Sequence, residues 1–120
     1  MMGNDDPVAA EKLAEIVPED FYDYTSKYHD DSAKLIIPAR ISEETAKEIR
    51  ELSVRAYKAM GCTGFARVDF FVRESGEVIL NEINTIPGFT QISMFPRLFI
   101  ESGTPYKEIV TRLAQLALQD

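Results

Sequence analysis

The sequence predicts a mixed α/β fold, in which helices flank an antiparallel sheet, on three observations. Residues 65–84 hold two runs of alternating apolar and polar side chains separated by Ser75 and Gly76, as in a β-hairpin. Apolar residues recur at helical spacing over residues 43–60 and again over residues 105–116. The length of 120 residues leaves room for one domain at most.

Composition and charge narrow the class of protein. An apolar fraction of 45% beside 28% charged residues is ordinary for a soluble globular chain. The formal net charge of -7 disfavours nucleic acid or an anionic membrane surface as a partner, and the apolar runs are far too short for a membrane span. The single cysteine, Cys62, forms no internal disulfide, and no basic-then-apolar leader opens the chain, so we expect a cytoplasmic protein.

The first 40 residues predict short elements only. Met1 and Met2 are followed at once by a cluster of turn-forming residues, 3–7, so we expect the chain to begin partway through a larger protein. We also expect a helical turn at Ala9–Ala14, a strand at Glu15–Val17, a loop over Phe21–Asp31 and a short buried strand over Lys34–Pro38.

The helix predicted after residue 42 carries clear signals at both ends. Ser42 is a good N-cap, Glu43 and Glu44 lie in the first turn, where the helix dipole favours negative charge, and Gly61 ends the helix. Its apolar face is expected to comprise Ala46, Ile49, Leu52, Ala56, Tyr57 and Met60.

Two further helices are predicted near the carboxyl end. The first begins at Ser93 and ends near Gly103. The second takes Thr104 as N-cap and Pro105 as its first residue. Its apolar stripe is expected to comprise Ile109, Val110, Leu113 and Leu116.

The strands Phe65–Val72 and Glu77–Asn84 are expected to pair around a two-residue turn, which sets Glu74 opposite Glu77. Side chains alternate along a strand, so each strand presents one set of residues to each face. On the second strand, the predicted set on one face is Val78, Leu80, Glu82 and Asn84.

The same register brings four polar residues together. Asp69 is expected directly opposite Glu82, and Arg67 opposite Asn84. Two opposed carboxylates destabilise a sheet unless something offsets their repulsion. Arg67 could neutralise both in a salt-bridge network. Alternatively, a hard cation such as Mg²⁺ or Mn²⁺, and not zinc, could bind between the carboxylates and the Asn84 amide oxygen. Strand geometry alone leaves these alternatives evenly balanced.

The residues after the second strand favour the metal alternative. Gly88 follows Pro87, and glycine lets backbone N–H groups approach an oxyanion closely. Ser93 and Met94 then start a helix, whose free N–H groups can bind carboxylate or phosphate. Taken singly, Gly88 could serve only a turn and Ser93 only a cap. Together with the metal-ligand types they indicate the handling of metal-bound phosphate beside an anionic substrate.

These residues resemble a known family. Residues 64–69 (GFARVD) and 80–90 (LNEINTIPGFT), with Ser93 and Met94, closely resemble the C-terminal signature of D-alanine–D-alanine ligases, which have the ATP-grasp fold. The resemblance covers essentially the whole chain, residues 1–120.

The resemblance extends to the amino-terminal part. Residues 21–24 (FYDY), with Lys27 and Tyr28, look like the active-site lid loop of the family. Residues 1–31 then include this lid, and residues 34–120 form the sheet and helix part that binds metal.

The resemblance implies an ATP-dependent ligation. ATP phosphorylates the carboxylate of one D-alanine, and the amine of a second attacks the acyl phosphate to give the dipeptide for peptidoglycan. By the same resemblance, Asp69, Glu82 and Asn84 would hold two Mg²⁺ or Mn²⁺ ions, with Glu82 bridging. Arg67 would stabilise the transferring phosphoryl group, and the Gly88 N–H would donate to the tetrahedral oxyanion.

The remaining roles concern the substrates. Ser93 and the Met94 N–H would hold the carboxylate of the second substrate. Lys27 would reach phosphate or carboxylate when the lid closes, and Asn81 and Glu82 would share nucleotide binding with it. Tyr28 would fix the closed lid, and its presence favours the dipeptide over D-alanyl-D-lactate. Met94 stands where many members have leucine, but a backbone donor does not depend on the side chain.

The family's N-terminal domain and central ATP-binding region are absent from these 120 residues. We therefore expect a fragment that is inactive alone, from a parent that is a homodimer. Two alternatives stay open: another ATP-grasp carboxylate–amine ligase, and a non-catalytic module. Residues 87–90 with Ser93 argue against the first, because they supply an amino-acid carboxylate site. The intact set of Asp69, Glu82 and Asn84 argues against the second, because a module without metal could relieve their repulsion by substitution.

Overall fold

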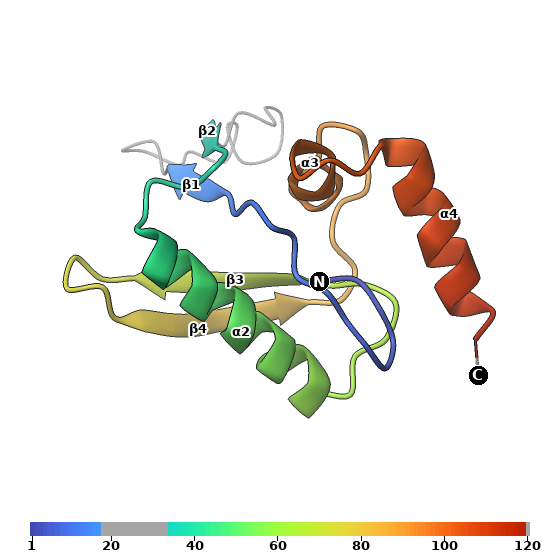
Figure 1. Ribbon diagram of the computed structural model, residues 1–120, viewed down its shortest axis with the longest axis horizontal. Coiled ribbons are helices and arrows are strands. Elements are labelled where there is room, and N and C mark those ends of the chain that lie inside the picture. Colours follow the sequence, from blue (N-terminus) through green and yellow to red (C-terminus); the bar gives the residue numbers. More distant parts are fainter. Residues whose placement is uncertain (18–33, 120) are drawn as a thin grey trace, which may run out of the picture.

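The computed structural model describes residues 1–17 and 34–119 and confirms a mixed fold of helices and antiparallel strands. In chain order the elements are β1 (Glu15–Val17), β2 (Lys34–Ile36), α2 (Glu43–Ala59), β3 (Arg67–Val72), β4 (Val78–Asn84), α3 (Met94–Glu101) and α4 (Tyr106–Ala117). Helix α2 runs across the hairpin of β3 and β4, while α3 and α4 lie near the end of the hairpin opposite its turn (Figure 1). The lid loop predicted over Phe21–Asp31 lies outside the described residues.

The helical turn predicted at Ala9–Ala14 is wrong. This segment directly follows an antiparallel bridge, in which Met2 and Val8 exchange backbone hydrogen bonds of 2.8 and 3.0 Å. Further along, the Lys12 amide donates to the Ser102 hydroxyl at 3.0 Å. Contacts with distant parts of the chain therefore hold the segment in a non-helical path and override its local preference.

Strands β1 and β2 confirm the two short strands predicted near the amino end. They pair antiparallel, with Glu15 opposite Ile36. The second strand ends at Ile36, two residues before the predicted end at Pro38. Leu35 and Ile36 are half-buried rather than buried. Among the described residues the two strands form a sheet of their own. Each strand therefore has a neighbour on one side only, whereas a fully buried strand has a neighbour on both sides.

Helix α2 begins and ends where the sequence predicts. The Ser42 hydroxyl accepts a hydrogen bond from the Thr45 amide at 3.1 Å, and Gly61 adopts a φ of 68° just beyond the helix. Tyr57 is fully buried, and its hydroxyl donates to the Gly3 carbonyl at 2.7 Å. Burial raises the pKa of Tyr57 to about 12. Met60, predicted on the apolar face, is instead 71% exposed because it lies just past the last helical residue.

Helices α3 and α4 differ in how well their starts are predicted. Helix α3 follows Ser93 as expected. Helix α4 begins one residue later than predicted, because Pro105 is extended, with ψ of 150°, and serves as the N-cap in place of Thr104. Val110 is 44% exposed, so its place in the apolar stripe is wrong. Among the helices of residues 1–17 and 34–119, none is long and apolar enough to cross a membrane.

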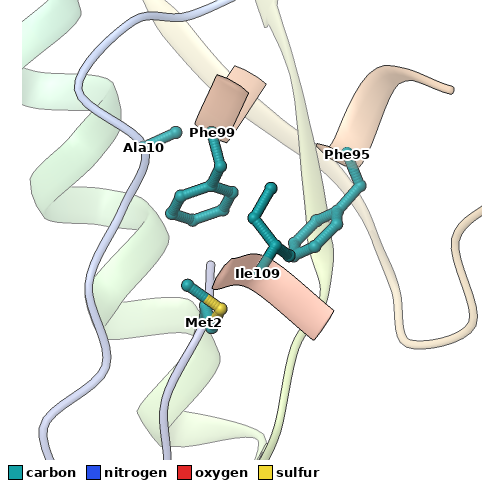
Figure 2. Packing of buried hydrophobic residues seen from close by; sticks show 5 residues of the cluster. All are labelled: Met2, Ala10, Phe95, Phe99 and Ile109. Carbon is teal, nitrogen blue, oxygen red and sulfur yellow. The ribbon is translucent and has the colours of Figure 1, made fainter. Parts of the chain in front are cut away.

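Two hydrophobic clusters hold these elements together, and the first two residues divide between them. Figure 2 shows Met2 facing the side chains of α3 and of Ile109 in α4. Met1 packs in the other cluster, with Tyr57 of α2 and Ala66 at the start of the hairpin. The members of the first cluster are Met2, Ala10, Phe95, Phe99 and Ile109, with several half-buried residues around them. The residues just before β3 thus contact both clusters, since Phe65 packs against the first and Ala66 belongs to the second.

Candidate functional site

The hairpin of β3 and β4 has the register on which the candidate site depends. Asp69 pairs with Glu82 and Arg67 pairs with Asn84, as predicted. Cross-strand partners project from the same face of a sheet, so these four side chains gather on one face. Val68 and Ile83 project from the opposite face and pack against the α2 cluster.

The turn of the hairpin is nevertheless not the predicted one. The Arg73 amide donates to the Glu77 carbonyl at 2.9 Å, so three residues, 74–76, form the loop and Glu74 does not pair with Glu77. The Gly76 amide donates to the Arg73 carbonyl at 2.8 Å, and Gly76 has a φ of 91°, which suits a turn followed by a left-handed glycine. The true loop is one residue longer than expected.

A bulge in β4 compensates for the longer loop. Phe70 pairs with Leu80, while Asp69 pairs with Glu82, so Asn81 is an extra residue between them. Because the bulge reverses the alternation, Leu80 does not share the face of Glu82, and the predicted set of Val78, Leu80, Glu82 and Asn84 is wrong at its first two members. Asn81, predicted to bind nucleotide, is this exposed bulge residue.

Arg67 lies between the two carboxylates. Its Nε and Nη2 donate to the two oxygens of Asp69 at 3.0 Å each, a bidentate pair. Its Nη2 is 3.9 Å from Glu82 Oε1, too long for a hydrogen bond. Asp69 is 16% exposed and Glu82 is 57% exposed. The salt-bridge network that the sequence allowed is therefore present in part. Arg67 neutralises Asp69 through two hydrogen bonds, but it makes no hydrogen bond to Glu82.

The donor set still fits a hard cation. Each Asp69 oxygen keeps a second lone pair, and the Glu82 carboxylate keeps nearly all of its lone pairs for a cation. The Asn84 side-chain oxygen accepts one hydrogen bond, from the Ile86 amide at 3.0 Å. Among the described residues, no group of three or more His, Cys, Asp or Glu side chains gathers as a metal site. Two carboxylates and an amide are an oxygen-only set of the kind that Mg²⁺ or Mn²⁺ prefers, with phosphate or water completing the coordination.

The loop after β4 brings Gly88 close to the start of α3. A Cβ atom at Gly88 would lie 3.3 Å from the Ser93 hydroxyl oxygen, which is tighter than ordinary contact. The Ser93 hydroxyl accepts from the Thr90 amide at 3.0 Å and lies 2.8 Å from the Thr90 hydroxyl. Ser93 therefore caps the loop rather than the helix, since it makes no side-chain hydrogen bond to α3.

The free donors of α3 are few. The first turn of a helix leaves its N–H groups without helical partners. Pro96, the third residue of α3, has no N–H, so the Met94 and Phe95 amides are the donors that the first turn can offer to an anion. Thr90 belongs to the segment 87–90 that the sequence predicted as part of the carboxylate site, whereas Pro96, two residues after Met94, was not singled out.

A cavity of about 1010 Å³ opens beside the hairpin. Arg67, Asp69 and Met94 line it, together with the chain before β1 and the start of α2. Arg40 lines it from the far side and bonds Glu15 through its guanidinium at 2.8 Å, which lowers the pKa of Glu15. Sequence reasoning missed this pair, because its two members are 25 residues apart with no motif between them. Lys27 and Tyr28 lie outside the described residues.

The fold and the motifs place this chain in one family. A family model described as "D-ala D-ala ligase C-terminus" matches residues 1–115, and the chain belongs to that family. The resemblance carried by residues 64–69 and 80–90 is thereby confirmed.

Individual relatives agree with this assignment. The chain is 54% identical to a D-alanine–D-alanine ligase of Ruminiclostridium cellulolyticum, over 99% of this chain and 32% of that protein. It is 50% identical to the corresponding ligase of Deinococcus radiodurans, over 100% of this chain and 36% of that protein. The chain therefore spans about a third of the length of the curated relatives that it matches.

Solved structures share the fold. The D-alanine–D-alanine ligase of Coxiella burnetii superposes with a TM-score of 0.82 at 38% identity, over 97% of this chain and 29% of that one. The VanG D-Ala:D-Ser ligase of Enterococcus faecalis superposes with a TM-score of 0.80 at 40% identity, over 98% and 34%. The expected C-terminal part of an ATP-grasp fold is thus confirmed.

Proposed function

We propose that this chain forms the part of the active site that binds metal and phosphate in an ATP-dependent ligase. This ligase joins two D-alanine molecules for peptidoglycan synthesis. The observation that carries the proposal is the cross-strand pair of Asp69 and Glu82, flanked by Arg67 and Asn84. It occurs in a chain about half identical to proteins named D-alanine–D-alanine ligase. The chain alone does not complete the reaction, because it spans only about a third of those proteins.

Asp69, Glu82 and Asn84 would hold two Mg²⁺ or Mn²⁺ ions, with Glu82 shared between them. When bound, these ions would neutralise charge on the phosphates of ATP. Arg67 already lies against Asp69 and within 3.9 Å of Glu82, so its guanidinium is held where charge on a transferred phosphoryl group would develop. Its half-buried position limits competing water and strengthens that interaction.

The loop and the start of α3 would bind the second substrate. The Met94 amide and the Ser93 hydroxyl lie together at the helix start, where a substrate carboxylate would be stabilised. Gly88 lies directly against Ser93, so its N–H can approach the carbonyl oxygen that becomes an oxyanion when the amine of the second D-alanine attacks the acyl phosphate. Phosphate is the group that then leaves.

Other parts of the proposal rest on the family alone. Lys27 would contact phosphate or carboxylate, Tyr28 would fix the closed lid, and Asn81 would contribute to ATP binding. The full-length parent would be a cytoplasmic homodimer that binds neither nucleic acid nor membrane. Another second substrate is a specific alternative, because one similar structure is described as a D-Ala:D-Ser ligase.

A chimera tests the function directly. This chain replaces the matching third of the Deinococcus radiodurans ligase, and ADP release is measured with D-alanine or D-serine as the second substrate. We expect D-alanine-dependent turnover, and we expect Asp69→Asn and Glu82→Gln each to reduce kcat by about 100-fold or more. Glu77→Gln is the matched control, since it removes one charge from the exposed end of the same hairpin.

Three outcomes would contradict the proposal. A folded chimera that binds ATP but releases ADP equally with and without an amino acid would indicate a different substrate. Preference for D-serine would reassign the second substrate. An unchanged kcat in Asp69→Asn would show that the carboxylate pair only forms a structural salt bridge with Arg67.

A further inference from the structure

The loop after β4, residues 85–92, is attached to the rest of the molecule through two side chains. Pro87 is buried and Phe89 is half-buried, whereas every other residue of the loop is exposed. Within the described part of the chain, the hydrogen bonds of the loop join it only to its own two ends. The position of the loop backbone therefore depends on what these two side chains pack against.

The ring of Phe89 contacts aromatic rings from three other parts of the fold. Its centroid lies 5.7 Å from that of Phe65 before β3, 5.8 Å from that of Phe95 in α3 and 5.6 Å from that of Tyr106 in α4. These separations lie in the range that aromatic pairs prefer. Phe65 and Phe95 also take part in the first hydrophobic cluster, whereas Tyr106 has Phe89 as its one aromatic neighbour among the described residues.

Helix α4 holds Tyr106 firmly in this place. The Thr104 amide donates to the Phe99 carbonyl at 2.8 Å, which fixes the connection between α3 and α4. Ile109 is fully buried and lies beside Phe95 in the first cluster (Figure 2). Residues three apart share one face of a helix, so the face that carries Ile109 toward the core also carries Tyr106.

We propose that Tyr106 is a positioning residue: its ring holds Phe89 and thereby keeps Thr90 against Ser93, where the carboxylate of the second substrate binds. The part of this inference that concerns the substrate rests on the function proposed above. Tyr106 acts through Phe89, and the contact requires the ring of Tyr106 rather than its hydroxyl.

The contact between Thr90 and Ser93 determines what the Ser93 hydroxyl can donate to. A hydroxyl oxygen has two lone pairs and one proton. The Thr90 amide donates to the Ser93 oxygen at 3.0 Å, and the Thr90 hydroxyl, at 2.8 Å, can donate to its second lone pair. The Ser93 proton is then left to donate to a carboxylate, in a charge-assisted hydrogen bond. A shift of Phe89 would move both of its neighbours, Thr90 and Gly88, and so disturb this geometry.

The test uses the chimera described above, with KM determined separately for ATP and for the first and second D-alanine. We expect Tyr106→Ala to raise the KM of the second D-alanine by about tenfold and to change the KM of ATP by less than about twofold. The reason is that the proposed metal and phosphate ligands lie on the hairpin and not on this loop. Tyr106→Phe keeps the ring and should retain both KM values.

Hydrogen exchange at the Thr90 amide gives a second measurement, which does not depend on activity. We expect Tyr106→Ala to speed this exchange by about tenfold, because the loop then leaves its bonded position more often. Leu113→Ala is the matched control, since Leu113 is a half-buried residue of the same helix that packs against the same cluster. It should lower stability but leave Thr90 exchange and both KM values unchanged. Tyr106→Leu, which keeps apolar volume without a ring, replaces Tyr106→Ala if that variant does not fold.

Three results would overturn the inference. Unchanged Thr90 exchange in the variant without the ring would show that the loop keeps its position without Tyr106. Equal acceleration in Leu113→Ala would show a general loss of stability. Faster Thr90 exchange with an unchanged KM of the second D-alanine would show that the contact does not serve that substrate. A chimera that releases ADP independently of D-alanine would instead contradict the proposed function, and Thr90 exchange would still decide whether Tyr106 positions the loop.

Discussion

The amine of Met1 is buried and donates to the Ala66 carbonyl, an uncommon environment for a group that carries charge in neutral solution. Burial lowers the pKa of this amine from 8.0 to about 5, because the ammonium loses its hydration and no carboxylate of residues 1–17 or 34–119 pairs with it. The neutral amine can still donate the hydrogen bond to Ala66. At this one residue, protonation state and folding are therefore coupled.

This coupling predicts how stability changes with pH. Between pH 5 and pH 8 the unfolded chain binds more protons at Met1 than the folded chain does, so the free energy of unfolding should rise with pH across this window. The full difference is at most about 4 kcal/mol, reached when pH falls from above 8 to below 5. Urea unfolding at several pH values measures it.

N-terminal acetylation provides the matched control, because it removes the titrating amine and keeps an N–H that can bond Ala66. We expect the acetylated chain to lose most of the pH dependence between 5 and 8. An equal slope in both forms would show that other groups cause it and that the Met1 amine stays solvated.

At the scale of single residues, only the parts of the candidate site that depend on local signals could be predicted from the sequence. Ser93 and Met94 were placed correctly at a helix start, because caps are local signals. That the Ser93 hydroxyl bonds Thr90 and lies beside Gly88 could not be predicted, since those contacts depend on the path of the loop between them.

At the scale of elements, the hairpin shows a correct prediction from partly wrong premises. The sequence indicated a two-residue turn, and the loop has three residues; it indicated a regular strand, and Asn81 is a bulge. Each difference shifts the register by one, and the two cancel, so Asp69 still meets Glu82. A bulge has weak sequence signals, whereas the pattern of alternating residues on either side of it is strong.

The loop conformation predicts the effect of Gly76→Ala. Gly76 has a φ of 91°, a backbone region that disfavours residues with a Cβ, while a Cβ there would meet no other atom within 4 Å. The cost should therefore come from the backbone alone, at about 1 kcal/mol of unfolding free energy. Chemical denaturation of Gly76→Ala measures it.

Ser75→Ala serves as the control, because it changes the neighbouring residue of the same loop without demanding a left-handed backbone. We expect a change of about 0.5 kcal/mol or less for that variant. A destabilisation at Gly76 no larger than that at Ser75 would mean that the loop relaxes to another turn, and with it the register near Glu77.

At the scale of the whole molecule, the arrangement of elements was less predictable than the elements themselves. Helix α2, the hairpin and α3 follow from local patterns of caps and apolar spacing. The division of the core into two clusters, with Met1 in one and Met2 in the other, arises from pairings across more than 60 residues that no local pattern encodes.

The first cluster predicts where the molecule is most sensitive to a lost side chain. Phe95 is 2% exposed, and its ring lies 5.2 Å from that of Phe65 and 5.3 Å from that of Phe99, measured between centroids. Truncating it removes contacts to the hairpin and within α3 at once. Phe95→Ala should therefore lower the free energy of unfolding by about 3–5 kcal/mol, a large part of what a domain of this size possesses.

Val110→Ala is the matched control on the neighbouring helix, since that side chain is 44% exposed and should cost less than about 1 kcal/mol. Denaturant unfolding followed by circular dichroism measures both variants. If the clusters around Tyr57 and Phe95 form one cooperative unit through Met1 and Met2, Phe95→Ala should shift a single transition. Two separate transitions would show that α3 and α4 unfold independently of α2 and the hairpin.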